Sequence, residues 1–270
     1  KLFEQLELQE PDTYEEFIAI CERLKRYELT PVVVGGKSIW HMGFWINHFY
    51  RTLVTSKQPD WGELRNAKEV SWQDETPALI VDSMRDLYEN GYINKDFSTI
   101  SDGEAIRLMA SGNFGMLYSG PWVVSRIKEI NPNIELGWFY LPDNNGNCYI
   151  FADRNSGWGI TEECKSNPRK YDAALKFLKF FYSQEIYGDI CKSMNAIPIT
   201  SYELNTKMSP LFAEIKDKME KATDISDIQI GDNNTPENFS TYAYRKIIDY
   251  MMGEVSKEVL LKELDIGWDE

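Results

Sequence analysis

Apolar positions along the chain recur mostly at the spacing of three and four residues that is typical of amphipathic helices. The segment "DTYEEFIAICERLKRYELT" (12–30) is the clearest case. Its apolar stripe consists of Phe17, Ile20, Cys21 and Leu24. Thr13 and Glu16 match the capping box S/T-x-x-E, so the pattern predicts a helix that starts after Thr13. Ser101 and Glu104 match the same box and predict a second helix start.

Short runs of apolar and β-branched residues between the helical segments predict strands. Three of them are "TPVVVGG" (30–36), "FGMLYS" (114–119) and "IELGWFYLP" (134–142). The predicted helices are 38–54, 74–93, 101–112, 121–130, 167–193 and, approximately, 209–222, 239–252 and 255–265. Helices and strands alternate as far as residue 142, which favours an α/β fold, and almost everything after residue 200 is helical.

Charge and composition narrow the function classes. The 270 residues include 43 acidic and 29 basic ones, for a net charge of -14, and such a surface repels the phosphates of nucleic acids. No apolar run approaches the roughly 20 residues of a membrane span. Two His and four dispersed Cys provide no close ligand pair, so we expect no metal and no cofactor. The cysteines fit free thiols or one or two disulfides.

Tryptophans beside glycine-containing turns are the most informative chemical signal. Trp40 follows "GGKSI", Trp122 follows "SGP", and Trp158 lies in "NSGWGI". Each of them taken alone is explained equally well by a place in the core. Three together predict flat aromatic rings at the ends of elements, where a ring can stack on the apolar face of a sugar while neighbouring polar groups bind its hydroxyls.

The order of motifs resembles family 1 of the extracellular solute-binding proteins, the sugar-capturing components of ABC importers, of which maltose-binding protein is a member. "ASGNFGMLYSGPW" (110–122) is similar to the family signature F-x-x-G-x-x-A-M-x-x-x-G-P-W. "GWGITEECKSNPRKYDAALKFLKFF" (157–181) resembles its "NP…A…FL" helix, and "NAIPI" (195–199) resembles its G-x-x-P turn without the usual glycines. The resemblance extends over essentially the whole chain.

The resemblance implies an α/β fold of the type II periplasmic-binding-protein class, which has two lobes with the ligand between them. Residues 1–150 and 200–270 would belong to the C-terminal lobe, which is helix-rich, and residues 151–199 to an excursion into the N-terminal lobe. The N-terminal segment of the family members, which builds most of the sheet in their N-terminal lobe, has no counterpart in this sequence. The chain is therefore expected to be N-terminally truncated and to lack its signal segment. The implied ligand-binding residues are Lys37, Trp40, Trp122, Asp153, Asn155, Trp158 and Tyr242.

The resemblance also implies two partners, a mono- or oligosaccharide and the subunits of an ABC permease. The protein would be lipid-anchored at the cell surface or located in the periplasm, and it would have no catalytic activity. The first alternative is a carbohydrate-active hydrolase, which needs two opposed carboxylates at a cleft. The second is a non-catalytic surface adhesin with an open groove. Apolar side chains of the excursion, including Leu175, Leu178 and Phe181, would lack the sheet on which such elements pack in the family. They predict that the excursion either folds back or self-associates.

Overall fold

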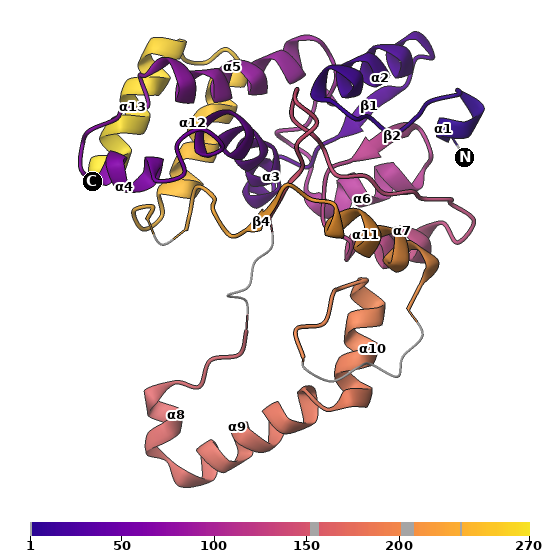
Figure 1. Ribbon diagram of the computed structural model, residues 1–270, viewed down its shortest axis with the longest axis vertical. Helices are drawn as coiled ribbons and strands as arrows, with labels where there is room; N and C mark the ends of the chain where they lie inside the picture. Colours follow the sequence, from indigo (N-terminus) through magenta and orange to yellow (C-terminus); the bar gives the residue numbers. More distant parts are fainter. Residues whose placement is uncertain (1, 152–156, 201–207, 233) are drawn as a thin grey trace.

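A computed structural model of the chain describes residues 2–151, 157–200, 208–232 and 234–270. Figure 1 shows a main body, which holds both the first and the last helix, and an excursion that projects from it. The helices of the main body are α1 (Leu2–Gln5), α2 (Tyr14–Arg26), α3 (Ile39–Phe49), α4 (Trp61–Asn66), α5 (Glu75–Glu89), α6 (Asp102–Ala110), α7 (Val123–Ile130), α11 (Pro210–Glu220), α12 (Phe239–Met251) and α13 (Lys257–Asp269). No helix in the described ranges is long and apolar enough to span a membrane.

A pair of short parallel strands lies in the main body. β1 (Thr30–Val33) pairs with β2 (Phe114–Leu117), and Val32 lies opposite Met116. Val32 also makes an isolated parallel bridge to Ile93. The three residues after Thr30 are buried, as expected of a β-branched run inside a fold. This pair confirms two of the predicted strands.

Local capping signals fix where helices begin. The box predicted from Ser101 and Glu104 is complete at α6: the Ser101 side chain accepts from the Glu104 N–H, and the Glu104 carboxylate accepts from the Ser101 N–H. Thr13 caps α2 by accepting from the N–H of Glu16 at 3.2 Å. Both helix starts are therefore confirmed.

The core between α4, α12 and α13 consists of aromatic side chains from the segments before and after the excursion. Trp61 and Trp72 pack edge to face with ring centroids 5.0 Å apart, and Phe239 meets Trp268 at 4.7 Å. All four side chains are buried. Residues that follow the excursion thus complete a core begun before it, and both parts of the chain are needed for this body.

Two parallel strands connect the main body with the excursion. β3 (Tyr149–Phe151) leads out and β4 (Asp224–Ser226) follows the return, with Tyr149 opposite Asp224. The helices of the excursion are α8 (Glu162–Ser166), α9 (Pro168–Phe181) and α10 (Gln184–Met194). The assignment of residues 151–199 to a second lobe stays a prediction.

The excursion lies largely apart from the main body (Figure 1). No residue of α8 or α9 is buried. α10 reaches α7, where the Ser125 hydroxyl donates to the carbonyl of Ser193. Of the two predicted outcomes, folding back onto the body is therefore not seen for α8 and α9, and self-association stays a prediction.

Three predicted elements differ from the structure. Residues 134–142 form no strand; at Trp138 the N–H donates to the Glu214 carboxylate at 3.2 Å and the carbonyl accepts from the Lys218 ammonium, instead of pairing with a neighbouring strand. The helix predicted over 167–193 is interrupted at Ser183, whose backbone is extended. The helix predicted over 38–54 ends in a π-helical turn, η1 (Tyr50–Thr55).

Candidate functional site

Three aromatic side chains from α3 and the start of α7 form a continuous surface, which we call the aromatic wall: Trp40, Phe44 and Trp122. Phe44 lies between the two tryptophans, with ring centroids 5.7 Å from Trp40 and 6.1 Å from Trp122. Trp40 is 46% exposed and Trp122 is 37% exposed, so both side chains are partly accessible to solvent. The Tyr118 ring packs against the wall, with its centroid 6.2 Å from that of Phe44. The structure thus brings together two of the three predicted tryptophans.

The geometry at Gly120 explains the Gly-Pro-Trp sequence. The Trp122 ring folds back over Gly120, and a Cβ at that position would lie 1.7 Å from ring atom Cζ3. Glycine is therefore required by the close approach of the ring. Pro121 precedes the first turn of α7, which begins at Val123, two residues later than predicted. Gly120 and Pro121 together hold Trp122 at the end of the helix.

A tight glycine loop places the other end of the wall. A Cβ on Gly35 would lie 2.7 Å from the Ser101 carbonyl, and one on Gly36 would lie 2.8 Å from the Phe97 ring. The loop is pinned there by a hydrogen bond from the Lys37 N–H to the Ile100 carbonyl at 3.0 Å. The Lys37 side chain is exposed three residues before Trp40, and its ammonium carries donors that a ligand could use.

A buried carboxylate lies between the two helices that carry the wall. Asp102, at the first position of α6, places Oδ1 3.5 Å from His41 Nδ1 and accepts a hydrogen bond at Oδ2 from Arg126 Nη1 at 3.3 Å. Its N–H donates to the Ser38 hydroxyl at 3.0 Å. The contact with His41, followed by that with Arg126, lowers the pKa of Asp102. The carboxylate is therefore held ionised beside the wall.

The remaining predicted residues lie elsewhere. Trp158 belongs to the excursion, is 56% exposed, and packs edge to face on Phe177 and Phe181 of α9 at 5.3 and 5.5 Å. Asp153 and Asn155 fall outside the described residues. The roles of all three in binding stay predictions.

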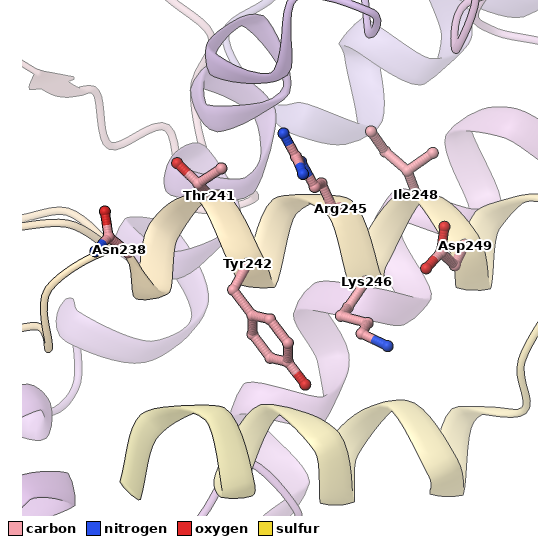
Figure 2. A pocket seen from close by; sticks show the side chains of 7 residues that line it. All are labelled: Asn238, Thr241, Tyr242, Arg245, Lys246, Ile248 and Asp249. Carbon is pink, nitrogen blue, oxygen red and sulfur yellow. The ribbon is translucent and has the colours of Figure 1, made fainter. Parts of the chain in front are cut away.

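Tyr242 lines a hollow of about 570 Å³ on α12 (Figure 2). The lining residues are Asn238, Thr241, Tyr242, Arg245, Lys246, Ile248 and Asp249. The Tyr242 side chain points toward α13, where its hydroxyl donates to the Glu263 carbonyl at 3.2 Å. Burial raises the pKa of Tyr242. Arg245 points to the other side, and no acidic side chain in the described ranges pairs with it.

Sequence reasoning missed Phe44, Asp102, Arg126 and Arg245. Helical spacing contained a signal for two of them. Phe44 is four residues after Trp40, and Arg126 is four residues after Trp122, so each shares a helix face with a predicted tryptophan. Asp102 had no such signal, because its partners come from other helices. Within the described ranges, no group of three or more His, Cys, Asp or Glu side chains could hold a metal ion.

Comparison with protein families gives a match to a model described as "Bacterial extracellular solute-binding protein", over residues 1–214. The chain is 23% identical over 212 residues to a "Multiple sugar-binding protein" of Streptococcus mutans, covering 77% of this chain and 50% of the relative. It is 20% identical over 266 residues to a "Probable sugar-binding periplasmic protein" of Brucella melitensis, covering 96% and 60%. The chain thus spans about half to three fifths of these curated relatives.

Solved structures share the fold. A "Chitin oligosaccharide binding protein" superposes with a TM-score of 0.83 at 22% identity, over 99% of this chain and 67% of that one. RafE in complex with raffinose superposes with a TM-score of 0.72 at 18% identity, over 98% and 67%. The fold is therefore the helix-rich α/β architecture of type II periplasmic sugar-binding proteins, as predicted.

Proposed function

Because this chain belongs to the family of bacterial extracellular solute-binding proteins, we propose that it is part of the carbohydrate-binding subunit of an ABC importer. In this function the protein captures an oligosaccharide in a cleft between two lobes and delivers it to the permease. The main body described above would supply the C-terminal side of the cleft. Closure of lobes around a ligand is the motion typical of periplasmic binding proteins.

The aromatic wall is the observation that carries this proposal. A pyranose ring has an apolar face that stacks on an indole, while its hydroxyls need polar partners at the edge of the same surface. Trp40 and Trp122 would offer the two stacking faces, and Phe44 lies between them. The exposed Lys37 and the half-exposed Arg126 would provide donors for the sugar hydroxyls. An extended wall of this kind suits an oligosaccharide.

The other predicted residues keep secondary roles in the proposal. Trp158, with Asp153 and Asn155, would approach the sugar from the excursion. Tyr242 would shape the hollow on α12, because its hydroxyl already donates to Glu263. Within that hollow Arg245 is better placed to bind a sugar hydroxyl.

We assign no catalysis to the protein. A glycosidase needs one carboxylic acid and one carboxylate that face each other across the scissile bond. Asp102, the carboxylate that bridges α3 and α7, instead directs its two oxygens at His41 and Arg126. Absence of turnover with aryl glycosides would agree with this assignment, whereas hydrolysis that depends on Asp102 would support the hydrolase alternative.

The proposed location is the outer side of the cytoplasmic membrane, by a lipid anchor on the cell surface or free in a periplasm. A curated relative is described as periplasmic, and the matching family model is extracellular. Detection of the protein on intact cells with an antibody, compared before and after protease treatment, tests this location.

Titration calorimetry tests the function. The full product of the gene is titrated with chitin oligosaccharides, raffinose, stachyose and mannotriose, and with a peptide mixture and divalent metals as controls. We expect saturable heat with at least one oligosaccharide. Heat with peptides or metals and with no sugar would contradict the proposal. The chain described here, which spans two thirds of the solved relatives, is expected to bind the same sugar more weakly.

A further inference from the structure

Asp102 is the one charged side chain of the main body that contacts both helices of the aromatic wall, among the described ion pairs. Its carboxylate is 10% exposed. His41, its partner on α3, is fully buried, and neither ring nitrogen forms a hydrogen bond within the described ranges; Nδ1 approaches Asp102 Oδ1 to 3.5 Å. Arg126, its partner on α7, is half exposed. A buried carboxylate with cationic or polar partners on two different elements fixes those elements relative to each other.

The partners of Asp102 are adjacent to the tryptophans of the wall. The His41 ring stacks on the Trp40 ring, with centroids 5.7 Å apart and planes inclined by 22°. Arg126 lies one helical turn after Trp122 on the same face of α7. The Asp102 carboxylate therefore contacts the ring that stacks on Trp40 and a side chain one helical turn after Trp122.

Helix capping does not explain why an acidic residue stands at this position. The start of α6 is already satisfied by the reciprocal bonds of Ser101 and Glu104. The Asp102 side chain contributes nothing to that box, and both of its oxygens point to other helices. Ser38 accepts from the Asp102 N–H instead of capping its own helix, α3. The carboxylate and N–H of Asp102 and the hydroxyl of Ser38 thus all make contacts between different elements.

We propose that Asp102 is a positioning residue for the sugar site: it sets the separation and tilt of Trp40 and Trp122, and so the spacing at which successive sugar rings stack. The positioning role concerns the protein alone, while its consequence for sugar binding rests on the proposed function. A carboxylate that contacts a buried imidazole and a guanidinium holds the two aromatic side chains at a fixed separation and tilt before the ligand binds. This lowers the entropic cost of binding.

Fluorine NMR of this chain, labelled with 5-fluorotryptophan, tests the positioning role without any ligand. Trp40→Phe and Trp122→Phe identify the two wall resonances among those of the eight tryptophans. Asp102→Asn preserves size and removes the charge. We expect it to shift or broaden both wall resonances and leave those of Trp61 and Trp268 in place. Asp82→Asn, which removes a carboxylate paired with Lys257 at 2.6 Å, is the matched control and should leave both wall resonances unchanged.

A second variant keeps the test decisive if Asp102→Asn fails to fold. Arg126→Met alters a half-exposed side chain, and we expect it to shift the Trp122 resonance, with partial return in Arg126→Lys. Unchanged wall resonances in a folded Asp102→Asn, or in Arg126→Met, would overturn the proposal.

Titration of the full gene product separates this proposal from the proposed function. Asp102→Asn should weaken sugar binding about tenfold, while Asp82→Asn should bind as the unaltered protein does. Shifted wall resonances together with no sugar binding by the unaltered protein would refute the importer function and leave the positioning role intact. Unchanged resonances together with normal sugar binding would refute the positioning role alone.

Discussion

Arg51 in the π-helical turn η1 forms an ion pair with Asp224, the first residue of β4. The guanidinium also lies over the ring of Tyr149 in β3, 5.5 Å from its centroid. Tyr149 and Asp224 are opposite each other in the parallel pair that connects the body with the excursion. One side chain in the first turn after α3, the helix that carries Trp40, thus contacts both connecting strands.

Loss of the Asp224 charge should destabilise the protein more than loss of Arg51. The Arg51 side chain is 9% exposed and that of Asp224 is 45% exposed, so Asp224→Asn leaves a buried guanidinium without its counterion, whereas Arg51→Met leaves a carboxylate that water can solvate. We expect about 2 kcal/mol for Asp224→Asn in urea unfolding followed by circular dichroism. Asp217→Asn, from an exposed pair with Lys221, is the control and should change less than about 0.5 kcal/mol. A larger effect of Arg51→Met would contradict this account.

Gly120→Ala should disturb sugar binding without contacting the sugar. The added methyl would overlap the Trp122 ring, so the ring must leave its place in the wall. Gly137→Ala is the control, because a Cβ there meets no atom within 4 Å. We expect calorimetry to show weaker binding for Gly120→Ala and no change for Gly137→Ala. Equal affinities in the two variants would mean that Trp122 does not bind from the observed position.

Trp122→Ala should weaken sugar binding by about 1–3 kcal/mol, the loss typical of an aromatic anchor. The ring is 37% exposed, so the cost in stability should stay below the roughly 3–5 kcal/mol of a fully buried tryptophan. Thermal melting and calorimetry on the same preparation separate the two effects. A large drop in melting temperature with unchanged affinity would show that Trp122 is a core residue.

Acidification should destabilise the protein through His48. Burial lowers the pKa of His48 to about 4, while an unfolded histidine titrates near pH 6.5. Below pH 6.5 the unfolded chain therefore takes up a proton that folded His48 refuses, and stability falls by about 3 kcal/mol between pH 6.5 and 4. His48→Phe should remove that part of the slope in urea unfolding at several pH values. Asp102, whose pKa is lowered, contributes separately below about pH 4. An unchanged slope would contradict the assignment to His48.

Self-association of this chain should depend on α9. Phe177 and Phe180 are 46% and 60% exposed on a helix with no buried residue, and such faces commonly mark contact surfaces. We expect light scattering to detect dimers that dissociate in the Phe177→Ser, Phe180→Ser double variant. Val259→Ser, which removes a similarly exposed side chain on α13, should leave the association unchanged. A monomer at every concentration would refute this prediction.

The sequence by itself determined the features that arise from interactions within a few residues. The helix starts at Ser101 and Thr13 follow from capping partners three positions away. The apolar stripe of α2 follows from the period of the helix, and the turn before Trp122 follows from Gly120 and Pro121. The family resemblance added the overall architecture, since the order of motifs is also written along the chain.

The tertiary structure alone decided which distant residues meet. Phe44 joins Trp40 to Trp122 because the fold brings the first turns of α3 beside the start of α7, and Asp102 contacts both His41 and Arg126 from a third helix. Residues 134–142 have the pattern of a strand, yet their backbone bonds to Glu214, a side chain far along the chain. Periodicity reports which face of a segment is apolar. It does not specify what that face packs against, because the partner is selected by the packing of the whole body.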